Sequence, residues 1–209
     1  MNQATREQAQ HFLRQDERLV AACAFELDPG VPYPPESLLA PPEPPALSRR
    51  IEARIPRPLR QLVHAKAADP HHLRPSAAAE TTHRLPDALD APGSRTPRGA
   101  GMEGGWESAA GRFLVSRANA HGSAGGVLAV TDRRWFALTD VSPLWRSTPV
   151  MRQFWEVPRQ AVSALRANPR GTAQKGRMDV EFTDGSWVAV LAVPASAARP
   201  FAEASAHLR

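Results

Sequence analysis

Five arginines lie close together in the first half of the chain, and Glu52 is the one acidic residue among them. They are Arg49, Arg50, Arg54, Arg57 and Arg60. Guanidinium groups bind phosphate and carboxylate groups through paired hydrogen bonds. The cluster therefore predicts contact with an acidic membrane surface or with a partner, and the alternative is a solvated helix face.

A second candidate for anion binding is the pair Arg133 and Arg134, which precedes Trp135 in an expected turn. Such an edge would suit an acidic peptide or a lipid headgroup. The alternative interpretation is that the two arginines are simply solvent-exposed side chains of a turn. Both interpretations stay open at the level of the sequence.

Other residue types that do chemistry lack a convincing arrangement. His64, His71, His72 and His83 lie in a stretch without helical or strand periodicity, whereas metal ligands need a rigid frame. The glycine-rich segment 122–126 precedes an expected strand, but a phosphate-binding loop should precede a helix. No nucleophile lies beside a base in a recognisable context, and no carboxylates are obviously paired. We therefore expect no catalytic residues, no cofactor and no metal.

Composition points to a cytoplasmic protein. The chain has 209 residues, a net charge of +5 and a pI near 10.5. Nearly all of the positive charge is arginine, with Lys66 and Lys175 as the two lysines, which indicates a GC-rich bacterial genome. The charge is spread along the chain, so nucleic acid is not an expected partner. The first 18 residues lack the apolar run of a secretory signal, and the single cysteine excludes an internal disulfide.

The two halves of the chain differ in character. Of the 21 prolines, 15 precede residue 101, whereas all five tryptophans follow it. The predicted organisation is an amphipathic helix over 1–28, a proline-rich linker over 29–47, an arginine-rich helical segment over 48–66, a low-complexity and partly disordered linker over 67–100, and a folded domain over 101–209. The first helix is predicted from Phe12, Leu19, Val20, Cys23 and Leu27, which recur at three- and four-residue steps.

The second half predicts antiparallel strands followed by a helix. Asp184 and Gly185 separate two alternating runs within 176–193, which indicates a two-residue turn with Phe182 opposite Trp187 and Met178 opposite Leu191. Further strands are expected at 126–130, 135–139, 154–157 and 161–166, whereas 106–119 is compatible with a helix or a strand. After Pro194, a terminal helix is predicted to bury Ala197, Phe201, Ala204 and Leu208.

The order of these motifs resembles a bacterial pleckstrin homology-like (PH-like) domain of an actinobacterial type, over roughly residues 106–209. The motifs are Val127-Leu128-Ala129-Val130-Thr131-Asp132-Arg133-Arg134-Trp135, then Trp155-Glu156-Val157-Pro158, then Val180-Glu181-Phe182-Thr183-Asp184-Gly185-Ser186-Trp187, and the final helix. The resemblance implies an α+β or mainly β fold, with an antiparallel curved sheet or barrel capped by a C-terminal helix. It also implies a scaffold that binds proteins, peptides or lipids and is usually not an enzyme.

The sequence thus predicts a non-enzymatic interaction protein. It would dock a protein partner, or a second copy of itself, through the PH-like domain and the N-terminal helix. The alternative is peripheral binding to acidic lipid headgroups through the arginines. An enzyme is the third hypothesis, and it lacks a constellation of residues that would carry it.

Overall fold

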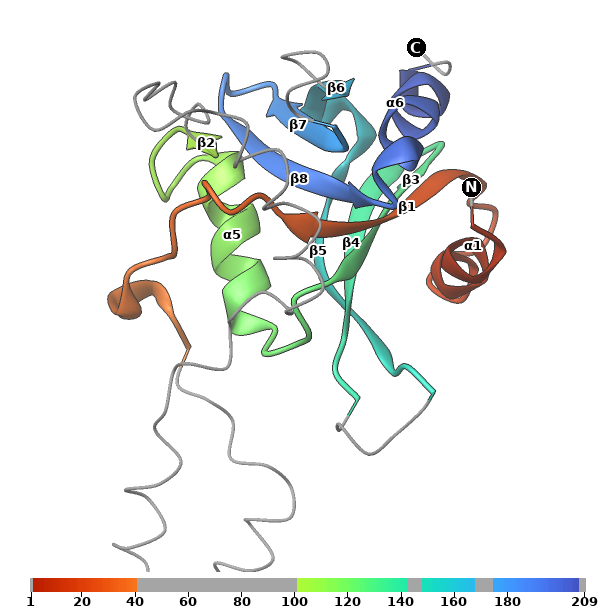
Figure 1. Cartoon of the computed structure of the whole chain (residues 1–209), viewed down its shortest axis with the longest axis horizontal. Coiled ribbons are helices and arrows are strands. Elements are labelled where there is room, and N and C mark those ends of the chain that lie inside the picture. The colour runs from red at the N-terminus through yellow and green to blue at the C-terminus, as the bar shows by residue number, and fades with distance from the viewer. Residues whose placement is uncertain (1, 41–100, 143–147, 168–174, 207–209) are drawn as a thin grey trace, which may run out of the picture.

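The computed structural model describes residues 2–40, 101–142, 148–167 and 175–206. These residues form one curved antiparallel sheet of eight strands, with a helix on each face and a third helix at the C-terminal end (Figure 1). The predicted mainly β or α+β fold with a C-terminal helix is therefore confirmed. The arginine cluster at 49–60 and the four histidines at 64–83 lie outside the described residues.

The sheet follows the order β5-β4-β3-β1-β8-β7-β6, and the short strand β2 also pairs with β8. The strands are β1 Leu19–Leu27, β2 Met102–Glu103, β3 Gly126–Thr131, β4 Arg134–Asp140, β5 Met151–Pro158, β6 Val162–Ala167, β7 Arg177–Phe182 and β8 Trp187–Val193. Within the described ranges, the α-helices are α1 Gln3–Gln10, α5 Ala109–Asn119 and α6 Ala198–Ala206, and the short 3-10 turns are η1 Glu36–Leu38, η3 Arg159–Ala161 and η5 Ala195–Ala197.

The prediction of one long helix over 1–28 was wrong. Helix α1 ends at Gln10, and Cys23 lies in strand β1 instead of on a helical stripe. Nearly every residue from Leu19 to Leu27 is apolar, so steps of three and four can be found there without a polar face to oppose them. A short, almost continuous apolar run is typical of a strand that is buried on both faces.

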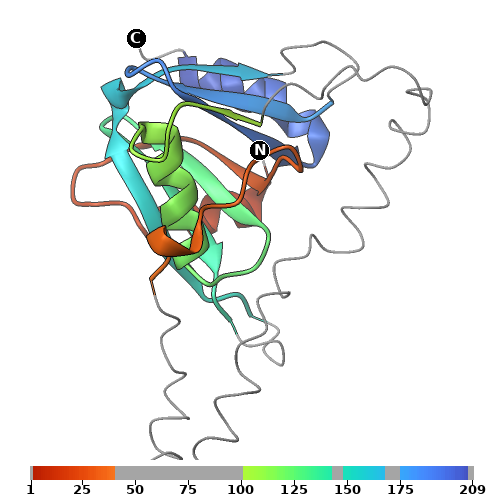
Figure 2. The same ribbon diagram turned by 90° about the vertical axis from the view of Figure 1, so that its left-hand side faces the viewer.

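Strand β1 joins the two halves of the sheet. It pairs with β3 from Leu19 to Phe25 and with β8 from Ala24 to Leu27. The domain predicted over 101–209 therefore does not contain the whole sheet. Its central strand β1 comes from residues 19–27, which were assigned to an N-terminal helix. Figure 2 shows the sheet bent at β1, with β3–β5 on one side and β6–β8 on the other.

Helices α1 and α5 lie on opposite faces of the sheet. The segment 106–119 contains helix α5, which Ser108 caps by accepting a hydrogen bond from the Gly111 amide at 3.2 Å. Phe113 of α5 packs inside the bend against Trp155, with ring centroids 5.0 Å apart. On the outer face, Ala9 of α1 packs with Val127, Ala129, Phe136 and Leu138.

The C-terminal helix covers the remaining open end of the bend. Phe201 of α6 is buried and meets Trp135 edge to face, with centroids 6.1 Å apart. Ala197 and Ala204 pack against the same core, as their spacing predicted. Leu208, the last residue of the predicted stripe, lies outside the described residues.

The β7–β8 hairpin was predicted in the correct place but with the wrong register. Phe182 lies opposite Ser186, since its amide donates to the Ser186 carbonyl at 2.8 Å, and Glu181 lies opposite Trp187. The loop therefore has three residues, 183–185, and only Gly185 among them has a positive φ, of 82°. This geometry is that of a type I turn followed by a glycine bulge. Met178, Val180 and Phe182 of β7 are all buried, as their alternation predicted, but Trp187 and Leu191 lie opposite Glu181 and Arg177 and so belong to the other face of the hairpin.

We expect the substitution Gly185→Ala to destabilise the fold by about 1–2 kcal/mol, because a left-handed backbone is strained for alanine. An added Cβ at Gly185 would meet nothing within 4 Å, so the effect is conformational and not steric. Gly105 offers a matched control, since its Cβ would also meet nothing and its φ is not positive. Urea denaturation of both variants measures the difference. Equal midpoints for Gly185→Ala and Gly105→Ala would contradict the turn geometry.

Candidate functional site: the β6–α6 groove

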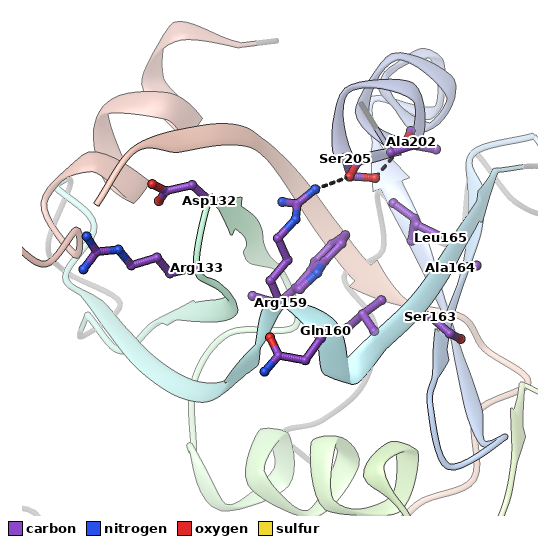
Figure 3. A pocket seen from close by; sticks show the side chains of 12 residues that line it. Asp132, Arg133, Arg159, Gln160, Ser163, Ala164, Leu165, Ala202 and Ser205 are labelled. Carbon is purple, nitrogen blue, oxygen red and sulfur yellow. Dashed lines mark hydrogen bonds between the residues drawn. The ribbon is translucent and has the colours of Figure 1, made fainter. Parts of the chain in front are cut away.

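A hollow of about 780 Å³ runs between strand β6 and helix α6 (Figure 3). We call it the β6–α6 groove. Residues 162–165 of β6 form one wall, and Ala202, Ser205 and Ala206 of α6 form the other. Trp135 also lines the groove, and Arg133 and Arg159 line it near the start of β6. Its volume lies in the range of pockets that bind small molecules or peptide side chains.

Strand β6 presents its backbone edge to this groove. It is the last strand of the sheet, and its one partner among the described strands is β7. Side chains alternate between the two faces of a strand, so a strand that offered one face would contribute every second residue. Four consecutive residues, Val162 to Leu165, line the groove instead, and the bulge at Ser163 contributes to this. Among the described strands, none pairs with the other side of β6, and an edge of this kind can accept a guest strand.

The edge of β6 is short and irregular, and this limits how much chain can pair with it. The register against β7 shifts between Val162 and Ala164, which marks a bulge at Ser163. Bulges and short lengths protect sheet edges from indiscriminate pairing. The groove therefore suits a short guest segment rather than the long edge of another sheet.

Arg159 fixes the distance between α6 and the sheet. Its side chain crosses toward α6, and Nη2 donates a hydrogen bond of 2.7 Å to the Ser205 carbonyl (Figure 3). Its Nη1 donates to the Thr131 carbonyl at the end of β3, also at 2.7 Å. A cation at the C-terminal turn of a helix is favourable, because the helix dipole leaves the last carbonyls partly negative.

The two arginines of the expected anion-binding turn lie in different environments. Arg133 is exposed and lines the groove, and its role as a contact residue stays a prediction. Arg134 is buried, with 5% of its surface exposed, and its guanidinium packs over the Phe136 ring at 4.7 Å. Because Arg134 begins strand β4 and points to the face under α1, it is not available to an external anion.

Arg134 instead forms the centre of an ion-pair network in which Arg134 and Glu17 are buried and Arg14 and Glu156 are exposed. Its Nε donates to Glu17 Oε1 at 2.8 Å, and its Nη1 donates to Glu156 Oε2 at 2.6 Å. Arg14 binds the same Glu156 carboxylate at 2.7 Å. The network ties the segment between α1 and β1 to strands β4 and β5. Sequence reasoning missed it, because residues 1–28 were predicted to form one helix and Glu17 is 117 positions from Arg134.

The network holds Glu17 in its charged form. Burial by itself would raise the pKa of Glu17, but hydrogen bonds from Arg134, the Arg14 amide and the Thr131 hydroxyl outweigh it and lower the pKa from 4.5 to about 2. The pKa of Glu156 is lowered too, because hydrogen bonds from Arg14 and Gln153 and the charge of Arg134 outweigh its burial. Both carboxylates therefore stabilise the fold through their ion pairs with arginine.

The glycine-rich segment 122–126 does not form a phosphate cradle. The carbonyls of Ser123 and Ala124 accept hydrogen bonds from the buried guanidinium of Arg117 on α5, which also donates to Thr139 Oγ1 at 3.1 Å. Burial lowers the pKa of Arg117 to about 10. Carbonyl oxygens turned toward a cation attract positive charge, which is the opposite of what a phosphate requires. Arg117 therefore anchors this loop.

Other candidates for chemistry stand apart in the part of the chain that the structure describes. Cys23 is buried, and burial raises the pKa of its thiol to about 11, so it lacks thiolate character at neutral pH. Within the described ranges, no three His, Cys, Asp or Glu residues gather closely enough to hold a metal ion. None of the helices described is long and apolar enough to cross a membrane.

The β6–α6 groove thus combines a strand edge that no described strand pairs with, the side chain of Trp135 and an arginine at its mouth. No protein-family model, curated protein or solved structure matches the chain.

Proposed function

We propose that this is a non-enzymatic interaction protein that docks an extended segment of a partner protein in the β6–α6 groove. The single observation that carries the proposal is the course of β6, an edge strand whose consecutive residues line the groove. An extended segment would add a strand to the sheet through main-chain hydrogen bonds, and α6 would receive its alternate side chains. The wall of α6 offers only small side chains, Ala202, Ser205 and Ala206, which leaves room for those of the guest.

We further propose that the fold is PH-like. The support is an antiparallel sheet bent at β1 and capped at its open end by a C-terminal helix. In this protein, residues 19–27 form a strand of the sheet instead of part of a separate helix that recruits a partner. Helix α1 covers the outer face of the sheet through Ala9, so partner binding is assigned to the groove and not to α1.

Lipid binding remains the alternative, with fewer residues to support it. Of the two arginines in the turn, only Arg133 is exposed. The proposed docking function does not depend on the arginines at 49–60. It predicts binding to peptides in the absence of any membrane.

Selection of short random peptides, displayed on phage, against the purified full chain tests the docking function. We expect enriched peptides to bind the wild type and to lose about tenfold or more in affinity for Ala202→Tyr, because the new ring fills the groove. Glu203→Tyr is the matched control, since Glu203 is the exposed neighbour on α6 and does not line the groove. It should bind like the wild type. Failure to enrich any peptide, or equal binding by Ala202→Tyr, would overturn the proposal.

A further inference from the structure

The mouth of the groove beside Arg133 carries an excess of positive charge. The charged residues that line this corner are Arg133, Arg159 and Asp132, and Arg18 adjoins them through backbone hydrogen bonds with Asp132. These three arginines outnumber the one carboxylate. The corner therefore favours an anionic guest.

Two of these arginines have guanidinium groups that no described residue binds. Arg18 and Arg133 are both exposed, and they lie on adjoining segments, since the Arg18 amide donates to Asp132 Oδ1 at 3.0 Å and the Asp132 amide donates to the Arg18 carbonyl at 3.1 Å. Asp132 thus already accepts a hydrogen bond from the backbone. Arg133 lines the groove and is the cation placed to meet a guest.

We infer that the docked segment carries an aspartate or glutamate where it passes Arg133. The inference rests on the proposed function and names the chemistry of the partner. Arginine binds carboxylates through two parallel hydrogen bonds, and opposite charges at the rim of an interface select partners and speed their association. An acidic side chain at this end also offsets the charge of the corner.

The direction of the sheet places this acidic residue toward the C-terminal end of the segment. Strand β6 starts at Val162, directly after the turn η3 that Arg159 begins, and runs away from the arginine corner toward Ala167. All strand pairs in the sheet are antiparallel, and antiparallel pairing is the commoner arrangement. An antiparallel guest therefore reaches Arg133 with its C-terminal end.

The length of the groove sets the spacing of the recognised motif. Residues 162–165 extend over about 13 Å, at about 3.3 Å per residue in a strand. About four guest residues can pair there, and those that face Trp135 and Leu165 should be apolar. The expected motif is a short run with alternate apolar residues, followed at once by aspartate or glutamate.

The same peptide selection, repeated with Arg133→Gln, tests this motif. We expect peptides selected on the wild type to be enriched in Asp or Glu directly after the apolar run, and to bind Arg133→Gln about fivefold more weakly. Arg199→Gln is the charge-matched control, because Arg199 is exposed on α6 and does not line the groove. It should leave the affinity within about twofold. The wild-type affinity should also fall as salt rises.

The outcomes separate this inference from the proposed function. One outcome is that the selected peptides bind Ala202→Tyr weakly but show no acidic preference and bind Arg133→Gln and the wild type equally. This result would overturn the acidic motif and leave the proposed docking in the groove standing. Acidic residues enriched at the N-terminal end would overturn the antiparallel direction. Peptides unaffected by Ala202→Tyr would overturn both proposals.

Discussion

A chain that begins at residue 101 should fail to form the sheet. Strand β1 lies between β3 and β8, so its removal separates β3–β5 from β6–β8 and exposes Val130 and Leu128 on one edge and Val190 on the other. Phe25, which is buried against Phe113, is lost as well. We expect a fragment of residues 101–209 to show no cooperative thermal transition by circular dichroism.

A shortened chain that keeps β1 provides the control. Residues 2–40 joined to 101–209 through a flexible linker should fold, because every described strand is present. The Ala40 amide binds Asn119 at the end of α5, and the Gly101 amide binds the Gly30 carbonyl. A Gly/Ser linker of about 12 residues, with ends about 19 Å apart on average, suffices to cover the length of α5. A cooperative transition in the 101–209 fragment would show that β1 is dispensable.

The second large effect is expected from Arg134→Met. The Glu17 side chain is 1% exposed, so loss of its partner would leave a buried carboxylate without the charge that compensates it. Such losses cost about 3–5 kcal/mol. Arg133→Met changes the exposed neighbour in the same turn and should cost less than about 0.5 kcal/mol. Urea denaturation at neutral pH measures both variants, and similar midpoints would contradict the network.

The pH dependence of stability checks the same network. The pKa of Glu17 is about 2 in the folded protein and 4.5 in the unfolded chain. The charged carboxylate therefore stabilises the fold fully above pH 4.5. This contribution, about 3 kcal/mol, is lost as the pH falls from 4.5 toward 2. The variant Glu17→Gln should therefore lose less stability over that interval than the wild type. An identical slope for both proteins would mean that Glu17 is not the responsible group.

Local sequence patterns predicted those elements whose contacts lie near one another in the chain. The β3–β4 pair and the buried face of α6 follow from the alternation and helical spacing of their own residues. Strand β1 was missed because its partners β3 and β8 lie about a hundred or more positions away, and without them an apolar run does not reveal its period.

The hairpin register depended on a contact that no local pattern contains. The Asp184 carboxylate accepts hydrogen bonds from the Ser186 amide at 3.0 Å and from the Ala109 amide at 2.7 Å. The second contact places Asp184 at the start of α5, 75 positions earlier in the chain, where a negative charge is favourable. An Asp-Gly pair fits both two- and three-residue turns, and this tertiary contact accompanies the longer one.

The candidate groove was predictable only in part. Arg133 was singled out from the sequence, but the edge position of β6 and the approach of α6 come from the order of the strands. Residues such as Ala202 and Ser205 carry no signal of binding, because small residues on a helix are ordinary. Arg159, which joins β3 to α6, was not singled out, because its partners Thr131 and Ser205 lie 28 and 46 positions away in the chain.

Hydrogen exchange of β6 tests the central proposal most directly. The amides of β6 that face away from β7 should exchange quickly in the free protein and slowly when a selected peptide is bound, because a guest strand accepts their hydrogen bonds. The amides of β5, at the other edge of the sheet, should not change. Slowed exchange within residues 163–165 is the predicted result. Peptide binding that leaves these amides unprotected, or that protects β5 instead, would contradict strand addition at the β6–α6 groove.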